Sequence, residues 1–216
     1  MAVVVEEKES AAVDLIESAK RRQIIEGARQ VFLTQGFDGA SMGEIARKAG
    51  VSKGTLYVYF ESKEDLFQVV AHDECLAQAE QVFALDHADH DVEALLTRLG
   101  TAFVKFLCRP ERMAPVRTIM SISERMPDIG RKFHETGPAT GAGRVAAYLE
   151  AQVRAGVLDV QDVEVAAAQF LESCTATLAK PILFGFGVVP SEDRINYVVG
   201  IAVKTFLSAY AKTSPL

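Results

Sequence analysis

Residues 41–60 constrain the fold more than any other part of the chain. Ser41 is followed three residues later by Glu44, the pattern of a capping box, in which hydroxyl and carboxylate each satisfy a free amide at a helix start. Gly50 can adopt the positive φ that ends a helix and turns the chain. Ser52 has the chemistry of the next N-cap. The segment therefore predicts two short helices joined by a tight turn.

The second of these helices separates its apolar and polar residues. Leu56 and Phe60 are four residues apart, so they share a face that points inward. The outward set is Lys53, Thr55, Tyr57 and Tyr59. Amides and short side chains in a first helical turn can approach a phosphate or a base edge. A third cap, Ser62 with Asp65, begins another helix just beyond. The pattern predicts a helix-turn-helix that reads a DNA groove.

Two parts of the chain resemble a known family. Residues 49–66, AGVSKGTLYVYFESKEDL, resemble the signature of the TetR family of bacterial transcriptional regulators, which covers about residues 20 to 70. Residues 123–128 and 146–158 are similar to the C-terminal domain of its AefR-like branch. The resemblance implies an all-α protein with an N-terminal three-helix DNA-binding domain and a C-terminal helical domain for ligand binding and dimerisation.

The resemblance also implies roles for individual residues. The candidate DNA-binding set is Ser41, Met42, Lys53, Gly54, Thr55, Tyr57, Tyr59 and Lys63. Ser41 matches the family's helix-start phosphate contact. The groove-facing positions are Lys53, Gly54 and Thr55. The positions that contact the DNA backbone are Tyr57, Tyr59 and Lys63.

Gly43 departs from the family pattern. Many relatives place an arginine or another long polar residue there, able to reach a phosphate or a base. Glycine makes no such contact, so we expect binding at this helix start to depend more on Ser41 and on Lys48 or Lys53.

Charge is distributed unevenly along the chain. The net charge is −6, but residues 19–63 carry eight Lys or Arg against four Asp or Glu, a balance of +4 that leaves −10 for the rest. Phosphate contacts supply the sequence-independent part of DNA affinity, so a basic module on an acidic body suits DNA binding. A solvated helix face is the alternative reading of the charge alone.

Periodicity indicates helix almost throughout, with no alternating strand pattern. With 216 residues and 49% hydrophobic content, the chain is long enough for two modules. We expect about nine helices, the first long one ending at Gly36. The domains predicted are a flexible acidic arm over residues 1–17, a helix-turn-helix domain over 18–64 and a ligand-binding and dimerisation domain over 65–216. Beyond the first domain, the expected helices lie near 62–85, 92–107, 112–126, 128–154 with an interruption around 137–143, 162–184 and 191–211.

The last helices carry apolar residues on more than one face, which favours burial against a second surface as well as their own domain. By resemblance, the last two helices of each subunit form a four-helix dimer interface, matching a palindromic double-stranded DNA operator. The candidate interface residues are Phe170, Cys174, Val198, Ala202 and Phe206. The alternative is an ordinary buried core helix.

An adaptable apolar lining for a small-molecule effector is predicted in the middle helices. The candidates are Phe103, Met120 and Phe170, each of which is also compatible with plain core. If the family mechanism holds, an apolar effector that favours one spacing of the two DNA modules releases the dimer from its operator.

No export or membrane segment is expected. The apolar residues 3–5 are followed at once by Glu6-Glu7-Lys8-Glu9, the wrong polarity for a leader, and no stretch is long enough to span a bilayer. Three dispersed cysteines suit a reducing compartment. These features predict a cytoplasmic protein, and the family resemblance implies a homodimer.

Two other functions stay open. One is a helical ligand-binding or adaptor protein without specific operator binding. The other is a small metal-dependent enzyme built on residues 86–91, where His87 and His90 lie among three aspartates. Because no catalytic constellation or third ligand set is visible, we expect no enzyme activity, no metal and no cofactor.

Overall fold

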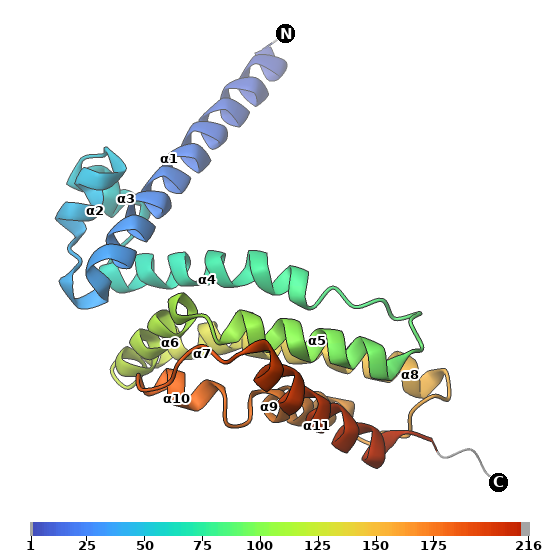
Figure 1. The fold of residues 1–216 in the computed structure, drawn as a ribbon. Helices are drawn as coiled ribbons and strands as arrows, with labels where there is room; N and C mark the ends of the chain where they lie inside the picture. The colour runs from blue at the N-terminus through green and yellow to red at the C-terminus, as the bar shows by residue number, and fades with distance from the viewer. Residues whose placement is uncertain (1, 213–216) are drawn as a thin grey trace. The chain divides into compact units, whose positions relative to one another are not determined.

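A computed structural model describes the backbone of residues 2–212 and the side chains of residues 18–70, 80–110 and 112–212. Over this range the chain is all-α, with eleven helices and a single isolated antiparallel bridge between Leu158 and Ala211 (Figure 1). It divides into two compact units, Met1–Glu74 and Cys75–Leu216. The division falls within the helix of residues 63–82, and the functional domain bounds given by the sequence stay a prediction.

The first unit contains α1 (Ala2–Gly39), α2 (Met42–Ala49), α3 (Lys53–Tyr59) and the beginning of α4 (Lys63–Val82). Its core is formed by the predicted face of the first helix, Ile24, Ile25, Ala28, Val31 and Phe32, together with buried residues of α2, α3 and α4. The Phe67 ring meets the rings of Phe32 and Phe37 edge-on, with centroids 5.1 and 5.0 Å away. Gly36 has φ +71° and interrupts α1 where the sequence predicted its end.

Close approach of α1 and α2 depends on a glycine. A Cβ placed on Gly27 would lie 2.7 Å from the Ala49 Cα and 2.8 Å from its backbone nitrogen. The Gln23 amide then donates to the Ala49 carbonyl at 2.6 Å. Contact through backbone atoms fixes the crossing of these two helices more tightly than side-chain packing alone.

The first residues of the chain differ from the expectation of a flexible arm. The structure extends α1 back to Ala2, so the backbone is helical through residues 2–17. Alanine and glutamate, which recur there, have high helix propensity, and this accounts for a helix. The side chains of residues 1–17 lie outside the described part of the structure.

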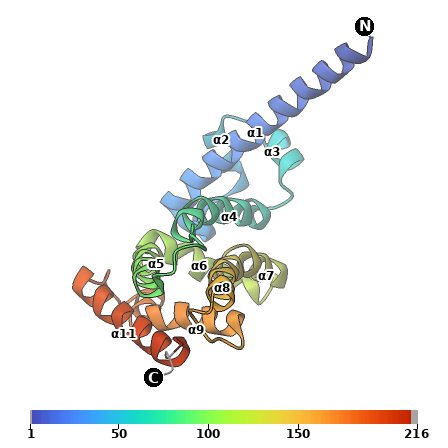
Figure 2. The same ribbon diagram turned by 90° about the vertical axis from the view of Figure 1, so that its right-hand side faces the viewer.

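The second unit holds the other seven helices. They are α5 (Val92–Leu107), α6 (Pro110–Ser123), α7 (Pro127–Thr136), α8 (Pro138–Arg154), α9 (Val163–Thr175), α10 (Ala179–Leu183) and α11 (Glu192–Tyr210). Figure 2 looks nearly along α5 and α8, with α9 and α11 packed on one side of them. Gly100 of α5 lets α9 and α11 come close, because a Cβ there would lie 2.8 Å from the Val199 side chain and 2.9 Å from the Cys174 sulfur.

Eleven helices replace the nine expected because two predicted helices are each divided. The 128–154 segment breaks at Gly137, and Pro138 begins α8, as the expected interruption near residue 137 indicated. The 162–184 segment breaks at Thr177, which has φ +65° and reverses the chain between α9 and α10. Proline favours the first helical turn, but no sequence signal marks a threonine in the left-handed region.

No helix within the described residues combines the length and the apolar character needed to cross a bilayer.

Candidate nucleic-acid interface

The first helix of the predicted motif begins at its expected cap. Ser41 has extended backbone angles, and its Oγ accepts from the Glu44 amide at 3.2 Å. The Glu44 carboxylate accepts a hydrogen bond from that same hydroxyl at 3.2 Å, rather than one from the Ser41 amide as a standard capping box predicts. An exposed serine thus stands at the start of α2.

The turn between α2 and α3 forms as the sequence predicts. Gly50 has φ +66°, and its amide donates to the Arg47 carbonyl at 3.2 Å, while the Val51 amide donates to the Ala46 carbonyl at 3.0 Å. These two bonds satisfy carbonyls at the end of α2 and reverse the chain within two residues.

Helix α3 presents its outer face to solvent. The Ser52 Oγ accepts from the Thr55 amide at 3.0 Å and lies 2.8 Å from the Thr55 Oγ1. Leu56 and Phe60 are buried, as predicted, while Lys53 and Gly54 are exposed and Thr55 and Tyr59 are half-buried. Tyr57 is 52% exposed. The predicted groove-facing residues therefore share one short, capped helix.

Val58 belongs to the same outer face, but the sequence reasoning left it out. It is 79% exposed, more than Tyr57. The signal was available, because two inward residues at positions 56 and 60 leave all three residues between them on or near the outer side. An exposed valine at this place can contact a thymine methyl group.

Lys53 lies across the start of α2, in the space that Gly43 leaves empty. A Cβ on Gly43 would lie 2.8 Å from the Lys53 Cε and 3.2 Å from its Nζ. It would lie 3.9 Å from the Ser41 Oγ. Ser41 and the ammonium of Lys53 thus flank the same helix start, where backbone amides and the helix dipole favour an anion.

Lys63 has structural partners within the first unit. Its Nζ donates to the Phe37 carbonyl at 2.7 Å and to the Ala40 carbonyl at 3.1 Å, and lies 4.3 Å from the centre of the Phe37 ring. An ammonium has three N–H donors, so one remains beyond these two bonds. The predicted phosphate contact of Lys63 stays a prediction.

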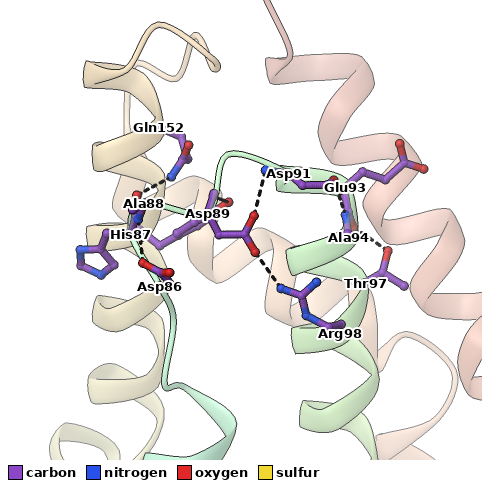
Figure 3. Close-up of polar contacts among 11 residues, drawn as sticks. Asp86, His87, Ala88, Asp89, Asp91, Glu93, Ala94, Thr97, Arg98 and Gln152 are labelled. Carbon is purple, nitrogen blue, oxygen red and sulfur yellow. Dashed lines mark hydrogen bonds and ion pairs between the residues drawn. The ribbon is translucent and has the colours of Figure 1, made fainter.

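Residues 86–91, here called the histidine loop, are held in the second unit by hydrogen bonds and an ion pair (Figure 3). The Asp91 side chain caps α5 at the Ala94 amide, 3.0 Å away, and Asp89 pairs with Arg98 at 2.8 Å. The hydrogen bond from Arg98 holds the pKa of the Asp89 carboxyl below its usual value. The Asp86 carboxylate accepts from the Ala88 amide at 2.9 Å. All three carboxylates of the loop are therefore occupied in a turn, a cap or an ion pair.

Two buried side chains of α8, Gln152 and Tyr148, form hydrogen bonds with the histidine loop. The Gln152 side chain is fully buried; its Oε1 lies 2.7 Å from the His90 Nδ1 and its amide donates to the His87 carbonyl at 3.0 Å. The Tyr148 hydroxyl donates to the Asp89 carbonyl at 2.9 Å, and burial raises the pKa of Tyr148 to about 12. Among residues with described side chains, no three His, Cys, Asp or Glu are arranged to hold a metal ion.

The three predicted effector residues occupy different surroundings. Phe103 is half-buried and its ring lies 5.8 Å from that of Phe83. Phe170 is buried against Phe206, with ring centres 5.7 Å apart. Met120 is 58% exposed. The effector site stays a prediction, because helical periodicity gives a residue's face but not what covers that face.

The predicted dimer residues are all buried in the core of the second unit, and their place in an interface stays a prediction. The five are Phe170, Cys174, Val198, Ala202 and Phe206. The exposed apolar residues of the same two helices are Val165 on α9 and Tyr197 and Ile201 on α11. A wide apolar stripe in the sequence does not show which of its sides meets the chain's own core.

The first unit has the architecture of a helix-turn-helix DNA-binding protein. Two short capped helices, α2 and α3, pack on α1, and the second exposes lysine, glycine, tyrosine and valine. The family model described as bacterial regulatory proteins of the tetR family matches residues 24–70. The model described as the AefR-like transcriptional repressor C-terminal domain matches residues 94–212. The chain belongs to the TetR family of DNA-binding transcriptional regulators.

Solved structures share this fold over nearly the whole chain. The Flavonoid-responsive Regulator FrrA is 33% identical, with a TM-score of 0.78 over 91% of this chain and 100% of that one. A TetR-family regulator from Mesorhizobium loti is 26% identical, with a TM-score of 0.77 over 90% of this chain and 98% of that one.

Curated relatives match over shorter segments. The transcriptional repressor BepR of Brucella suis is 32% identical over 53% of this chain and 58% of its own length. The regulator YvdT of Bacillus subtilis is 34% identical over 37% of this chain and 41% of its own length. The chain thus matches about half the length of these relatives.

Proposed function

We propose that this regulator is a ligand-responsive repressor that binds a palindromic operator as a dimer and is released by a small apolar effector. The exposed face of the capped helix α3 is the observation that carries the DNA-binding part. The relatives named as repressors support the direction of regulation. A regulator of chromosomal genes acts in the cytoplasm, and the proposal requires no catalysis.

The residues of the interface divide between phosphate and base contacts. Ser41 and Lys53 flank the start of α2, where a phosphate would meet a hydroxyl, backbone amides and an ammonium together. Tyr57 and Tyr59 extend the backbone contacts along α3. Gly54 and Thr55, in the first turn of α3, are the candidates for base edges, together with Met42, which begins α2.

A dimer is proposed through the outer faces of α9 and α11. Val165, Tyr197 and Ile201 are the exposed apolar residues there, and none of them contributes to the core of its own unit. A two-fold axis through this surface would give two identical reading helices, which require two identical half-sites on DNA. Palindromy of the operator follows from that symmetry.

The effector proposal rests on a solved structure that covers 91% of this chain. FrrA is described as flavonoid-responsive, and the likeness extends through the C-terminal unit at 33% identity. We therefore take a flavonoid such as quercetin as the first effector to test. An effector releases DNA only if it binds the operator-incompetent state better than the competent one.

Fluorescence anisotropy with DNA from upstream of the protein's own gene tests the proposal. At near-physiological salt, we expect saturable binding that scrambled DNA does not displace, with a stoichiometry of two chains per operator. Added flavonoid should lower the affinity. Displacement by scrambled DNA with equal efficiency contradicts operator recognition and favours the adaptor alternative. Operator affinity that no bound ligand changes contradicts the effector part alone.

A further inference from the structure

Residues 184–189, here called the phenylalanine loop, lie in the connection between α10 and α11 (Figure 1). Their apolar side chains are exposed. Phe184 is 71% exposed, Phe186 76%, Val188 84% and Val189 57%. Single exposed apolar residues are common, but a contiguous exposed set marks an interaction surface. Nothing already described for the fold or the DNA interface uses this loop.

Backbone hydrogen bonds hold the loop in its exposed conformation. The Phe184 amide donates to the Lys180 carbonyl at 2.9 Å, and the amides of Phe186 and Gly187 both donate to the Pro181 carbonyl, at 3.1 and 2.9 Å. A Cβ on Gly187 would lie 2.7 Å from the Pro181 backbone carbon. The chain therefore wraps tightly on the end of α10, and the phenylalanine rings are held out in solvent.

The reversal that precedes α10 and the phenylalanine loop is connected to α11 by a hydrogen bond. Thr177, at the reversal before α10, has φ +65°, a conformation that is strained for a β-branched residue. The Arg194 guanidinium donates to the Thr177 Oγ1 at 3.0 Å and lies 5.5 Å from the centre of the Tyr197 ring. One arginine thus connects the strained reversal to an exposed ring on the outer face of α11.

We propose that the phenylalanine loop docks on a second copy of this chain, extending the dimer surface formed by the outer faces of α9 and α11. The inference rests on the dimer in the proposed function and adds residues to it. The loop directly precedes α11 in the chain, and Arg194 links the reversal before α10 to the exposed ring of Tyr197 on α11. Because a two-fold interface uses the same patch on both subunits, each loop would be covered by the partner.

Area supports a second copy as the occupant. A stable interface buries about 800 Å² per partner, more than the three half-exposed side chains of α9 and α11 provide. A buried aromatic side chain contributes about 150–250 Å². The two phenylalanines, each about three-quarters exposed, therefore supply a substantial part of the missing area.

Charge argues against a lipid surface as the occupant. Residues 184–189 contain no charged side chain, and Glu192 and Asp193 follow at the start of α11. Binding to anionic lipids is favoured by clustered Lys and Arg, which this flank lacks. An uncharged apolar loop is instead suited to the core of a protein interface, where charged residues are depleted.

Sedimentation velocity of the full chain over a dilution series tests the proposal. The double variant Phe184→Ser/Phe186→Ser should weaken the dimer by on the order of tenfold or more, since buried aromatic anchors dominate interface energies. Leu33→Ser is the matched control, because it removes an equally exposed apolar side chain (62%) from α1 and should leave the dimer unchanged. Ile201→Glu tests the outer face of α11 separately.

The outcomes distinguish this inference from the proposed function. If the wild type is a dimer that Ile201→Glu dissociates while the loop variant matches the wild type, the loop proposal is overturned and the dimer stands. If the wild type is monomeric at every concentration, the dimer itself is overturned. Binding of the wild type to anionic phospholipid vesicles that is lost in the loop variant overturns the second copy as the occupant.

A tryptophan reporter gives a second, independent readout. The chain has no tryptophan, so Phe186→Trp introduces a single fluorophore at an exposed position that should not disturb folding. Its emission should shift to longer wavelength as the dimer dissociates on dilution, because the ring enters water. Emission that stays constant across the dissociation range contradicts the proposal; Leu33→Trp should show no shift.

Discussion

The two units of the chain differ in what determines their structure. In the DNA-binding unit, helix ends are decided by residues three or four positions apart, such as Ser41 with Glu44 and Ser52 with Thr55. In the second unit, the arrangement depends on contacts between distant residues, such as Gly100 with Cys174 and Val199. The difference teaches that a few residues close in sequence can define a DNA-binding surface. The surface that meets another protein depends instead on how all helices of the second unit pack.

Gly27→Ala should give the largest effect, and it should destabilise the first unit without affecting the second. Its Cβ would collide with backbone atoms of Ala49, which cannot rotate away, so we expect a loss of about 3 kcal/mol in the first unit. DNA binding should fail while the second unit remains folded. Hydrogen exchange read unit by unit measures this. Gly143→Ala, where a Cβ meets nothing within 4 Å, is the control and should stabilise the protein slightly.

Gln152→Ala should destabilise the second unit alone, by about 2 kcal/mol. The substitution leaves the His87 carbonyl and the His90 imidazole without their buried partner. Urea denaturation followed by circular dichroism gives the change in the free energy of unfolding. Gln161→Ala, at an exposed glutamine, should have almost no effect. Equal stability of the two variants would show that the hydrogen bonds of Gln152 do not stabilise the histidine loop.

Tyr57→Ala should lower operator affinity on the order of tenfold, a loss of about 1.4 kcal/mol, without changing helix content or the dimer. The ring is half exposed on α3 and carries little of the core, so the loss should come from DNA contact. Anisotropy with operator DNA measures it. A variant that is misfolded, or that binds as well as the wild type, contradicts the assigned contact.

Thr55→Ala should instead change which operator is preferred. Its hydroxyl bonds to Ser52 within the cap, and its side chain lies in the first turn of the reading helix. Competition among operator variants with single base changes should reveal a relaxed preference at one position of each half-site. Circular dichroism controls for loss of the cap. An unchanged ranking of operators would remove Thr55 from direct readout.

The smallest expected effect concerns the reactivity and ionisation of one buried cysteine. All three cysteines follow Glu74 and belong to the second unit by sequence. Burial raises the pKa of the Cys174 thiol from 9.0 to about 12. The unfolded chain then loses this proton first, so the contribution of Cys174 to stability should disappear as pH rises from about 9 to about 12. In a Cys75→Ser/Cys108→Ser variant, Cys174 should not react with Ellman's reagent at pH 8 until urea is added. Rapid reaction of the folded variant would contradict its burial.

The sequence predicted the DNA-binding unit almost completely because its signals are local. Both caps, the turn at Gly50 and the inward pair on α3 lie where the pattern indicated. The exceptions are tertiary: Lys63 turns to carbonyls of a segment more than twenty residues earlier, and Lys53 occupies the space above Gly43.

In the second unit, the sequence predicted the helices but not which side of each helix faces the core. The apolar stripe of α11 was found, yet its inner and outer sides could not be told apart without Gly100, Phe170 and Cys174 packed against it. The reversal at Thr177 had no signal, because its conformation is supported by Arg194 from another helix. The exposed phenylalanine loop read simply as an apolar stretch.

The empty space at Gly43 links two positions that are ten residues apart in the chain. Any side chain at 43 has to move the Lys53 ammonium away from the start of α2. A long cation at position 43 would take over that place and free position 53 to carry a different residue toward the groove. Libraries designed to retarget this regulator should therefore randomise positions 43 and 53 together, since variation of either one alone misses the combinations in which both residues change.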